Sequence, residues 1–184
     1  KNLELEPGTL IIADSKRPVA LAGVMGGIDT SVNESTTDIF IESAFFHPPA
    51  IRMSARKAGI HSESSYRFER GTDYDAVISA CKRAADLIMS VCRQAKASGI
   101  SDIYPEKIHQ PGIEINPQDI NSILGTKLQD EQIFSCIKAI QPGISSSPPP
   151  WIFLPPSYRR DLETRWDIAE ETARFCGYDM IPAE

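Results

Sequence analysis

The chain has 184 residues, of which 41% are hydrophobic and 24% charged, a composition typical of folded globular domains that excludes an intrinsically disordered chain. Its length suits one domain of moderate size or two small ones. No apolar run approaches the roughly 20 residues that a membrane-spanning helix needs, so no membrane span is expected. Nineteen basic residues against twenty-five acidic ones give a net charge of −6. Any contact with nucleic acid must therefore be local or shared with another chain.

The termini and the cysteines indicate where the protein works. The sequence begins with Lys1 and has neither an initiator methionine nor the apolar core of a signal peptide, so we expect a part of a longer, cytoplasmic protein. Its four cysteines are scattered and form no CxxC pair, which favours free thiols over a disulfide framework or a zinc ribbon. They are Cys81, Cys92, Cys136 and Cys176.

The first half of the chain has the pattern of an α+β fold. Short apolar runs predict strands over 10–13, 19–22 and 38–45. The pair Pro48-Pro49 predicts the start of a helix that Gly59 closes. Apolar residues at three- and four-residue steps predict a long packing helix over about 74–97.

A second unit follows a predicted linker at 101–112, where the periodicity is lost and Pro and Gly appear. We therefore expect one domain over 1–100 and another over 113–184. Within the latter, the pattern predicts two short helices, the first from Asn116 to just before Gly125 and the second over 130–140. A strand over 151–154 and a final helix over 162–176 complete it.

Two segments of the first half are candidates for a site. Three glycines in 22–27 indicate a tight turn or a backbone that a ligand approaches closely, and both readings stay open. The spacing lacks the GxGxxG pattern of a dinucleotide-binding loop. The segment 52–73 mixes arginines, hydroxyls and two glutamates, which fits either phosphate binding or, more commonly, a solvated charged face.

A third candidate segment is acidic. Asp161 precedes the last helix, and Asp167, Glu170 and Glu171 share one face of it. Carboxylates gathered in this way suit Mg²⁺ or Ca²⁺, whereas the alternative is a solvated acidic helix that the helix dipole favours.

Four ordered motifs carry a family resemblance. LAGVMGG, IFIESAFF, IRMSARKAGIHSESSYRFERGTD and PPSYRRDLETRWDIAEETARFCGYDMIP resemble the β subunit of bacterial phenylalanyl-tRNA synthetase, in the same order. The resemblance implies that 1–100 is the later part of a tRNA-editing domain, a partial mixed sheet with packing helices. It implies a small winged-helix-like α/β module over 113–184. The first part of the editing domain is expected to precede Lys1, so the chain alone is expected to be inactive.

The resemblance also implies site residues. Glu42 corresponds to the family's glutamate that binds the phenol of tyrosine, and the remaining editing-pocket positions are Ala22, Gly23, Ser62 and Ser64. The family more often has alanine at the position of Ser64. The resemblance gives no role to His61 and no catalytic residue to this chain. The family's Mg²⁺ ligands, shared with the α subunit, correspond to Asp161, Asp167, Glu170 and Glu171.

The implied function is that of a ligase subunit. The parent α2β2 enzyme would attach phenylalanine to its tRNA using ATP, which is not expected to bind here, and this region would contribute to hydrolysis of Tyr-tRNA. The implied partners are the α subunit and tRNA. Two other readings stay open: a non-catalytic tRNA-binding or subunit-interaction module, and a stand-alone trans-editing relative.

Overall fold

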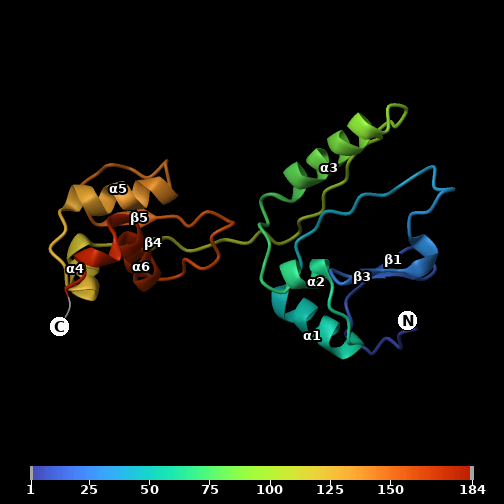
Figure 1. The fold of residues 1–184 in the computed structure, drawn as a ribbon, viewed down its shortest axis with the longest axis horizontal. Coiled ribbons are helices and arrows are strands. Elements are labelled where there is room, and N and C mark those ends of the chain that lie inside the picture. The colour runs from blue at the N-terminus through green and yellow to red at the C-terminus, as the bar shows by residue number, and fades with distance from the viewer. Residues whose placement is uncertain (1, 183–184) are drawn as a thin grey trace. The chain divides into compact units, whose positions relative to one another are not determined.

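The computed structural model of the chain describes residues 2–182 and divides into two compact units, one ending at Ile103 and the other beginning at Tyr104 (Figure 1). Each unit has helices and a small antiparallel sheet, so the fold is α+β, as the sequence predicts. Among residues 2–182, no helix combines the length and apolar character needed to cross a membrane.

The first unit begins with a three-stranded sheet in the order β1-β2-β3, formed by Ile11–Ala13, Pro18–Leu21 and Met25–Gly26. The strands are antiparallel, with Ile11 opposite Leu21 and Leu21 opposite Met25. The Asp14 side chain accepts hydrogen bonds from the backbone N–H groups of Lys16 and Arg17 and so closes the first turn. The first two predicted strands are confirmed, and the sheet is antiparallel where a mixed sheet was expected.

Two helices pack beside this sheet. Helix α1 (Pro48–Ala58) starts at the proline pair and ends at Gly59, whose left-handed backbone closes it as predicted. Helix α2 (Glu63–Phe68) was not predicted. The small core of the unit consists of buried side chains from the sheet and α1, namely Leu21, Val24, Ile51 and Ala55.

Two predictions for the first unit are wrong. Residues 38–45 form no strand, and Phe40 is 93% exposed. A strand needs a neighbour for its backbone groups, and within the described residues this segment has none. Helix α3 (Val77–Val91) stops short of residue 97 and has no buried residue. Beyond Val91 the apolar stripe ends, so nothing in the pattern favours further helical turns.

The second unit pairs strands β4 (Ile113–Ile115) and β5 (Trp151–Phe153) in an antiparallel ribbon. Its helices are α4 (Pro117–Leu124), α5 (Asp130–Ile140) and α6 (Arg165–Cys176). The helices before Gly125 and over 130–140 are confirmed. Helix α6 starts three residues later than predicted because Thr164 caps it in a reciprocal capping box with Asp167.

The second unit has the larger core. Alternate residues of both strands point inward, and α6 packs on α4 and α5. The fully buried members from strands and helices include Ile115, Ile120, Ile133, Ile137, Phe153, Ile168 and Ala169. This core fixes the positions of the side chains on α6 and its approach, including the predicted carboxylates.

Candidate functional site

The glycine turn of the first unit is held by the start of α2. Ser62 donates its hydroxyl proton to the carbonyl of Val24 at 2.6 Å, and Ser64 donates to the carbonyl of Gly23 at 3.1 Å. The Ser62 hydroxyl also accepts the backbone N–H of Ser65 at 3.0 Å, which caps α2. The structure therefore brings together three of the five predicted editing residues, Gly23, Ser62 and Ser64.

Gly23 is required by its backbone and its neighbours. Its φ of +65° lies in the left-handed region, and a Cβ there would come within 2.9 Å of both the Ile51 and the Phe46 side chains. Ala22 beside it is buried. These two residues face the packed interior around the turn, and the backbone carbonyls of the turn face the two serines.

Glu42 lies in the irregular segment that the sequence predicted as a strand. Its neighbour Ser43 donates a hydrogen bond to the carbonyl of Val77, the first residue of α3, at 2.8 Å. Four residues after Glu42, Phe46 packs edge-on against Phe68 and reaches Gly23. The segment is thus attached to the start of α3 through Ser43 and to the glycine turn through Phe46.

The carboxylate of Glu42 is not paired with another side chain. Within residues 2–182 Glu42 is exposed and makes neither a hydrogen bond nor an ion pair through its carboxylate. Partial desolvation raises its pKa above the ordinary value for glutamate. No hydrogen bond joins it to the cluster of Gly23, Ser62 and Ser64 in the described part of the chain, and its exposed carboxylate is open to water.

In the second unit, an arginine that sequence reasoning missed organises the acidic segment. Arg159 forms a bidentate contact with Asp161, at 3.0 Å from Nε and 2.6 Å from Nη2, and its Nη2 also lies 3.0 Å from Glu171. Arg174 binds Glu171 from the other side. The Glu171 side chain is only 13% exposed and Arg159 only 21%, whereas Asp161 and Arg174 lie at the water-exposed edge of the network. The adjacent letters SYRRD were the signal that a cation accompanies the carboxylates.

These contacts shift the titration of both carboxylates in one direction. Hydrogen bonds from Arg174, and then from Arg159, hold the pKa of Glu171 below its ordinary value against the opposing desolvation. Hydrogen bonds from Arg159 likewise lower the pKa of Asp161. Both groups are therefore ionised at neutral pH and already paired with cations.

Asp167 and Glu170 take no part in the contacts with Arg159 and Arg174. Asp167 accepts the backbone N–H groups of Glu163 and Thr164 and the Thr164 hydroxyl, at 2.6–3.0 Å. Desolvation acts to raise the pKa of Asp167, but these hydrogen bonds outweigh it and lower the pKa. Glu170 projects from the exposed face of α6. Asp167 thus caps the helix, as in a capping box.

The chemistry of the four carboxylates suits Mg²⁺, but their arrangement does not fit an ion. Two of them hold guanidinium groups and one caps α6. Within residues 2–182, no group of three or more His, Cys, Asp or Glu side chains is placed to hold a metal. An ion would have to displace Arg159 and Arg174 before it could use Glu171.

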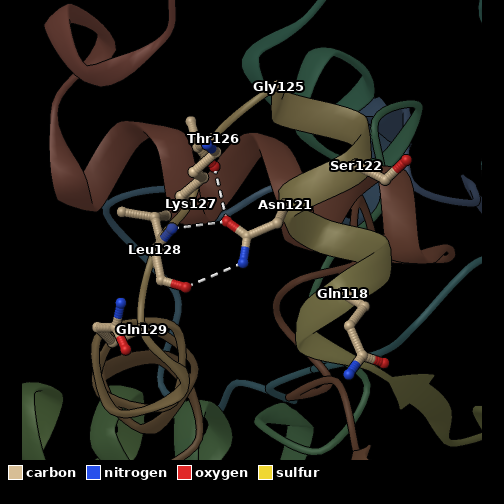
Figure 2. Close-up of a pocket in the computed structure, with 8 residues that line it drawn as sticks. All are labelled: Gln118, Asn121, Ser122, Gly125, Thr126, Lys127, Leu128 and Gln129. Atoms are coloured by element: carbon tan, nitrogen blue, oxygen red, sulfur yellow. Dashed lines mark hydrogen bonds between the residues drawn. The ribbon is translucent and has the colours of Figure 1, made fainter.

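A shallow surface hollow of about 510 Å³ lies between α4 and the loop that leads to α5 (Figure 2). Figure 2 shows the Asn121 side chain spanning it: the amide oxygen accepts from the Thr126 hydroxyl and the Leu128 N–H, and the amide nitrogen donates to the Leu128 carbonyl. These bonds, of 2.7–2.9 Å, satisfy Asn121 internally. The asparagine fixes the turn between the two helices.

Comparison with known proteins identifies both units. Residues 1–93 match the B3/4 domain and residues 113–178 match the tRNA synthetase B5 domain. The two units are thus modules of an aminoacyl-tRNA synthetase subunit. The chain belongs to the family of phenylalanine–tRNA ligase β subunits.

The relatives named phenylalanine–tRNA ligase β subunit align with almost the whole chain. That of Thiobacillus denitrificans is 38% identical over 183 residues, covering 100% of this chain. The proteins of Moorella thermoacetica and Francisella tularensis are 40% and 41% identical, over 97% and 98% of it. The chain spans 22–23% of the length of these relatives.

Proposed function

We propose that this chain is the part of a cytoplasmic phenylalanine–tRNA ligase that contributes to hydrolysis of mischarged Tyr-tRNA. The observation that carries the proposal is the alignment of the whole chain, through both modules in order, with proteins of that name. The complete enzyme, an α2β2 assembly, would attach phenylalanine to its tRNA with ATP. Editing would act afterwards on the wrong ester.

The need for editing follows from the substrates. Tyrosine differs from phenylalanine by one hydroxyl, and an apolar pocket rejects such an isostere only weakly. A second site must therefore recognise the phenol positively. The simplest recognition is a carboxylate that accepts the phenol proton, because a charge-assisted hydrogen bond is strong and directional.

Glu42 has the properties that this role requires. Its exposed carboxylate accepts no hydrogen bond from another residue within residues 2–182, and partial desolvation raises its pKa. A tyrosine phenol would supply the missing donor. Bound phenylalanine would cover the carboxylate and displace its water without supplying a donor, at a cost of about 1–3 kcal/mol.

The glycine turn supports the same site from the other end of the segment. Phe46, four residues after Glu42, packs beside Gly23. Ser62 and Ser64 donate hydrogen bonds to the carbonyls of the turn. We assign to Ala22, Gly23, Ser62 and Ser64 the shaping of the wall beside the amino acid. Hydrolysis itself would use positioned water rather than a nucleophilic side chain of this chain.

The second unit is better suited to a protein partner than to tRNA phosphates. Residues 104–184 carry seven basic and twelve acidic residues, a net charge of −5 that repels a nucleic-acid backbone. Trp166 is 60% exposed on the outer face of α6, where Glu170 also lies. Exposed tryptophans are frequent anchors of protein interfaces. We assign this face to the α subunit and leave tRNA contacts to other parts of the enzyme.

Magnesium stays a prediction for the assembled enzyme. The four carboxylates offer the oxygen ligands that Mg²⁺ prefers. In this structure three of them, Asp161, Asp167 and Glu171, are committed to Arg159, Arg174 and the start of α6, so we derive no chemical step through the ion.

The proposal is tested on the complete β polypeptide assembled with its α subunit. We expect ATP-dependent attachment of phenylalanine to its tRNA, together with hydrolysis of preformed Tyr-tRNA. An assembly that charges no tRNA with phenylalanine would contradict the ligase assignment. An assembly that charges tRNA but leaves Tyr-tRNA intact would contradict the editing assignment.

A further inference from the structure

Two cysteine thiols meet inside the second unit, although the chain separates them by 40 residues. Cys136 lies on the inner face of α5, and Cys176 is the last residue of α6. Their sulfur atoms are 3.4 Å apart, and both are thiols. The two helices pack directly against each other, so the pair is part of the α5–α6 contact.

The two sulfur atoms are near enough for a disulfide to form after a small movement. An S–S bond is about 2.05 Å long, so the sulfur atoms must approach by about 1.4 Å for the bond to form. Cys176 stands at a helix end, where the backbone adjusts most easily. Gly177 follows it, and a Cβ placed on that glycine would meet no atom within 4 Å, so the space around the turn is open.

We propose that Cys136 and Cys176 form an oxidisable dithiol, which a hydroperoxide converts into a disulfide that links α5 to α6. The two sulfur atoms differ in access: Cys136 is buried, whereas Cys176 is only partly covered. The hydroperoxide therefore reaches Cys176 first, and Cys136 resolves the product.

Oxidation of the pair proceeds in two steps. The Cys176 thiolate attacks the hydroperoxide; an S–O bond forms, the O–O bond breaks, and the alcohol or water departs after taking up a proton. The sulfur of Cys136 then attacks the sulfenic acid of Cys176. The S–S bond forms, the S–O bond breaks, and hydroxide leaves as water with the proton of Cys136. Two thiols lose two electrons in total, and the hydroperoxide gains them.

The order of the steps agrees with the electrostatics of the pair. Burial, reinforced by the neighbouring Cys176 sulfur, raises the pKa of the Cys136 thiol. Cys136 is thus protonated at neutral pH, which makes it a poor first nucleophile. Its attack on an adjacent sulfenic acid is intramolecular, which compensates for the small thiolate fraction.

The test uses the full, reduced chain treated with hydrogen peroxide in slight molar excess. We expect an intact mass lower by about 2 Da, and a tryptic digest in which peptide 128–138 is joined to peptide 175–184. Dithiothreitol should separate them. The crosslink should also raise the unfolding midpoint of the unit by at least about 5 °C, because it restricts the unfolded chain.

Variants separate this pair from general thiol oxidation. Cys176→Ser lies at a helix end and should remain folded, yet form no linked peptide. Cys81→Ser is the matched control and should form as much of the linked peptide as the wild type does. The proposal is overturned if peroxide produces only sulfinic or sulfonic acid at Cys176, if the crosslinks involve exposed Cys92 instead, or if the wild type is oxidised without loss of 2 Da.

Discussion

Glu42 has one property that is unfavourable for stability: its carboxylate is partly desolvated, although the residue is exposed, and no donor within the described residues compensates for this. Functional sites commonly retain groups that destabilise the fold, because activity needs them in that state. The raised pKa of Glu42 therefore links the proposed recognition of tyrosine to a measurable cost in folding.

We predict that Glu42→Gln stabilises the first unit at neutral pH. The pKa of Glu42 is higher in the folded than in the unfolded chain, so the folded state binds protons more readily and the charged form costs stability at higher pH. The advantage of glutamine is thus present above the folded pKa. It disappears as the pH falls below the unfolded pKa, where both states are protonated.

The measurement is the unfolding midpoint of both proteins at pH 7.5 and near pH 3.5. Glu34→Gln, the same change at another exposed glutamate of this unit, serves as the control and should leave the midpoint nearly unchanged. If Glu42→Gln lowered the midpoint at pH 7.5, the carboxylate would have a stabilising partner and our account of it would be wrong.

A second prediction at the residue scale concerns Gly23. Gly23→Ala forces a side chain into a left-handed backbone and against Ile51 and Phe46, so we expect a loss of about 1–3 kcal/mol in the free energy of unfolding. Gly26→Ala is the matched control, because nothing lies within 4 Å of a Cβ there. Chemical denaturation measures both. Equal losses for the two variants would show that the close packing at Gly23 is not the cause.

At the scale of elements, α6 is held by charge pairs that the sequence suggested as metal ligands. Glu171 joins Arg159 to Arg174 beside the core, and Asp167 caps the helix. Removing one partner of a shielded pair leaves the other charge without compensation, which is the main energetic penalty. The acidic residues therefore have a structural role in this chain that does not depend on an ion.

We predict that Glu171→Gln destabilises the second unit by about 1–3 kcal/mol, whereas Asp161→Asn, at a largely exposed carboxylate, costs less than about 1 kcal/mol. The contribution of Glu171 comes from a lowered pKa, so it is fully present above the unfolded pKa of a glutamate and is lost as the pH falls through the folded pKa. Thermal unfolding between pH 7 and pH 3 measures the difference.

The same melting experiment distinguishes the ion from the arginines. With the chain alone, added Mg²⁺ should leave the midpoint of the wild type and of Glu171→Gln unchanged. A rise with Mg²⁺ in the wild type that Glu171→Gln abolishes would contradict the arginine network as the resting state of these carboxylates.

At the scale of the whole molecule, the two units differ in net charge. The second unit carries most of the net negative charge and exposes Trp166, so we assign it to a protein partner. We predict that Trp166→Ala weakens association of the complete β polypeptide with α by at least about tenfold and leaves the melting of the chain nearly unchanged. Leu154→Ala, at an exposed apolar residue elsewhere in the unit, is the control. Wild-type affinity in Trp166→Ala would remove this face from the interface.

Local signals in the sequence were sufficient for most elements. Helix α1 begins at Pro48 and is closed by Gly59, as predicted, and the asparagine before Pro117 caps α4. Helix α2 was missed because Ser62 and Ser65 cap it with two hydroxyls, a pattern that reads as a polar loop. The segment 38–45 was wrongly predicted as a strand because alternating apolar residues favour strands only where a pairing partner exists.

The candidate sites depended more on distance in space than on spacing in sequence. The family resemblance was needed to select Glu42, because nothing in the letters around it shows an unpaired acceptor. The contacts of Ser62 and Ser64 with the glycine turn span about 40 residues and had no sequence signal. The pairing of Cys136 with Cys176 is of the same kind, since only the packing of α5 on α6 brings the two thiols together.

The most direct test of the central claim is the hydrolysis of Tyr-tRNA relative to Phe-tRNA by the complete α–β enzyme, with and without Glu42→Ala. We expect the variant to lose Tyr-tRNA hydrolysis by at least about tenfold, the equivalent of one charge-assisted hydrogen bond, while charging with phenylalanine stays near the wild-type rate. The ratio of the two hydrolysis rates should fall accordingly. An unchanged ratio, or a parallel loss of hydrolysis and charging, would contradict the assignment of Glu42 as the residue that recognises tyrosine.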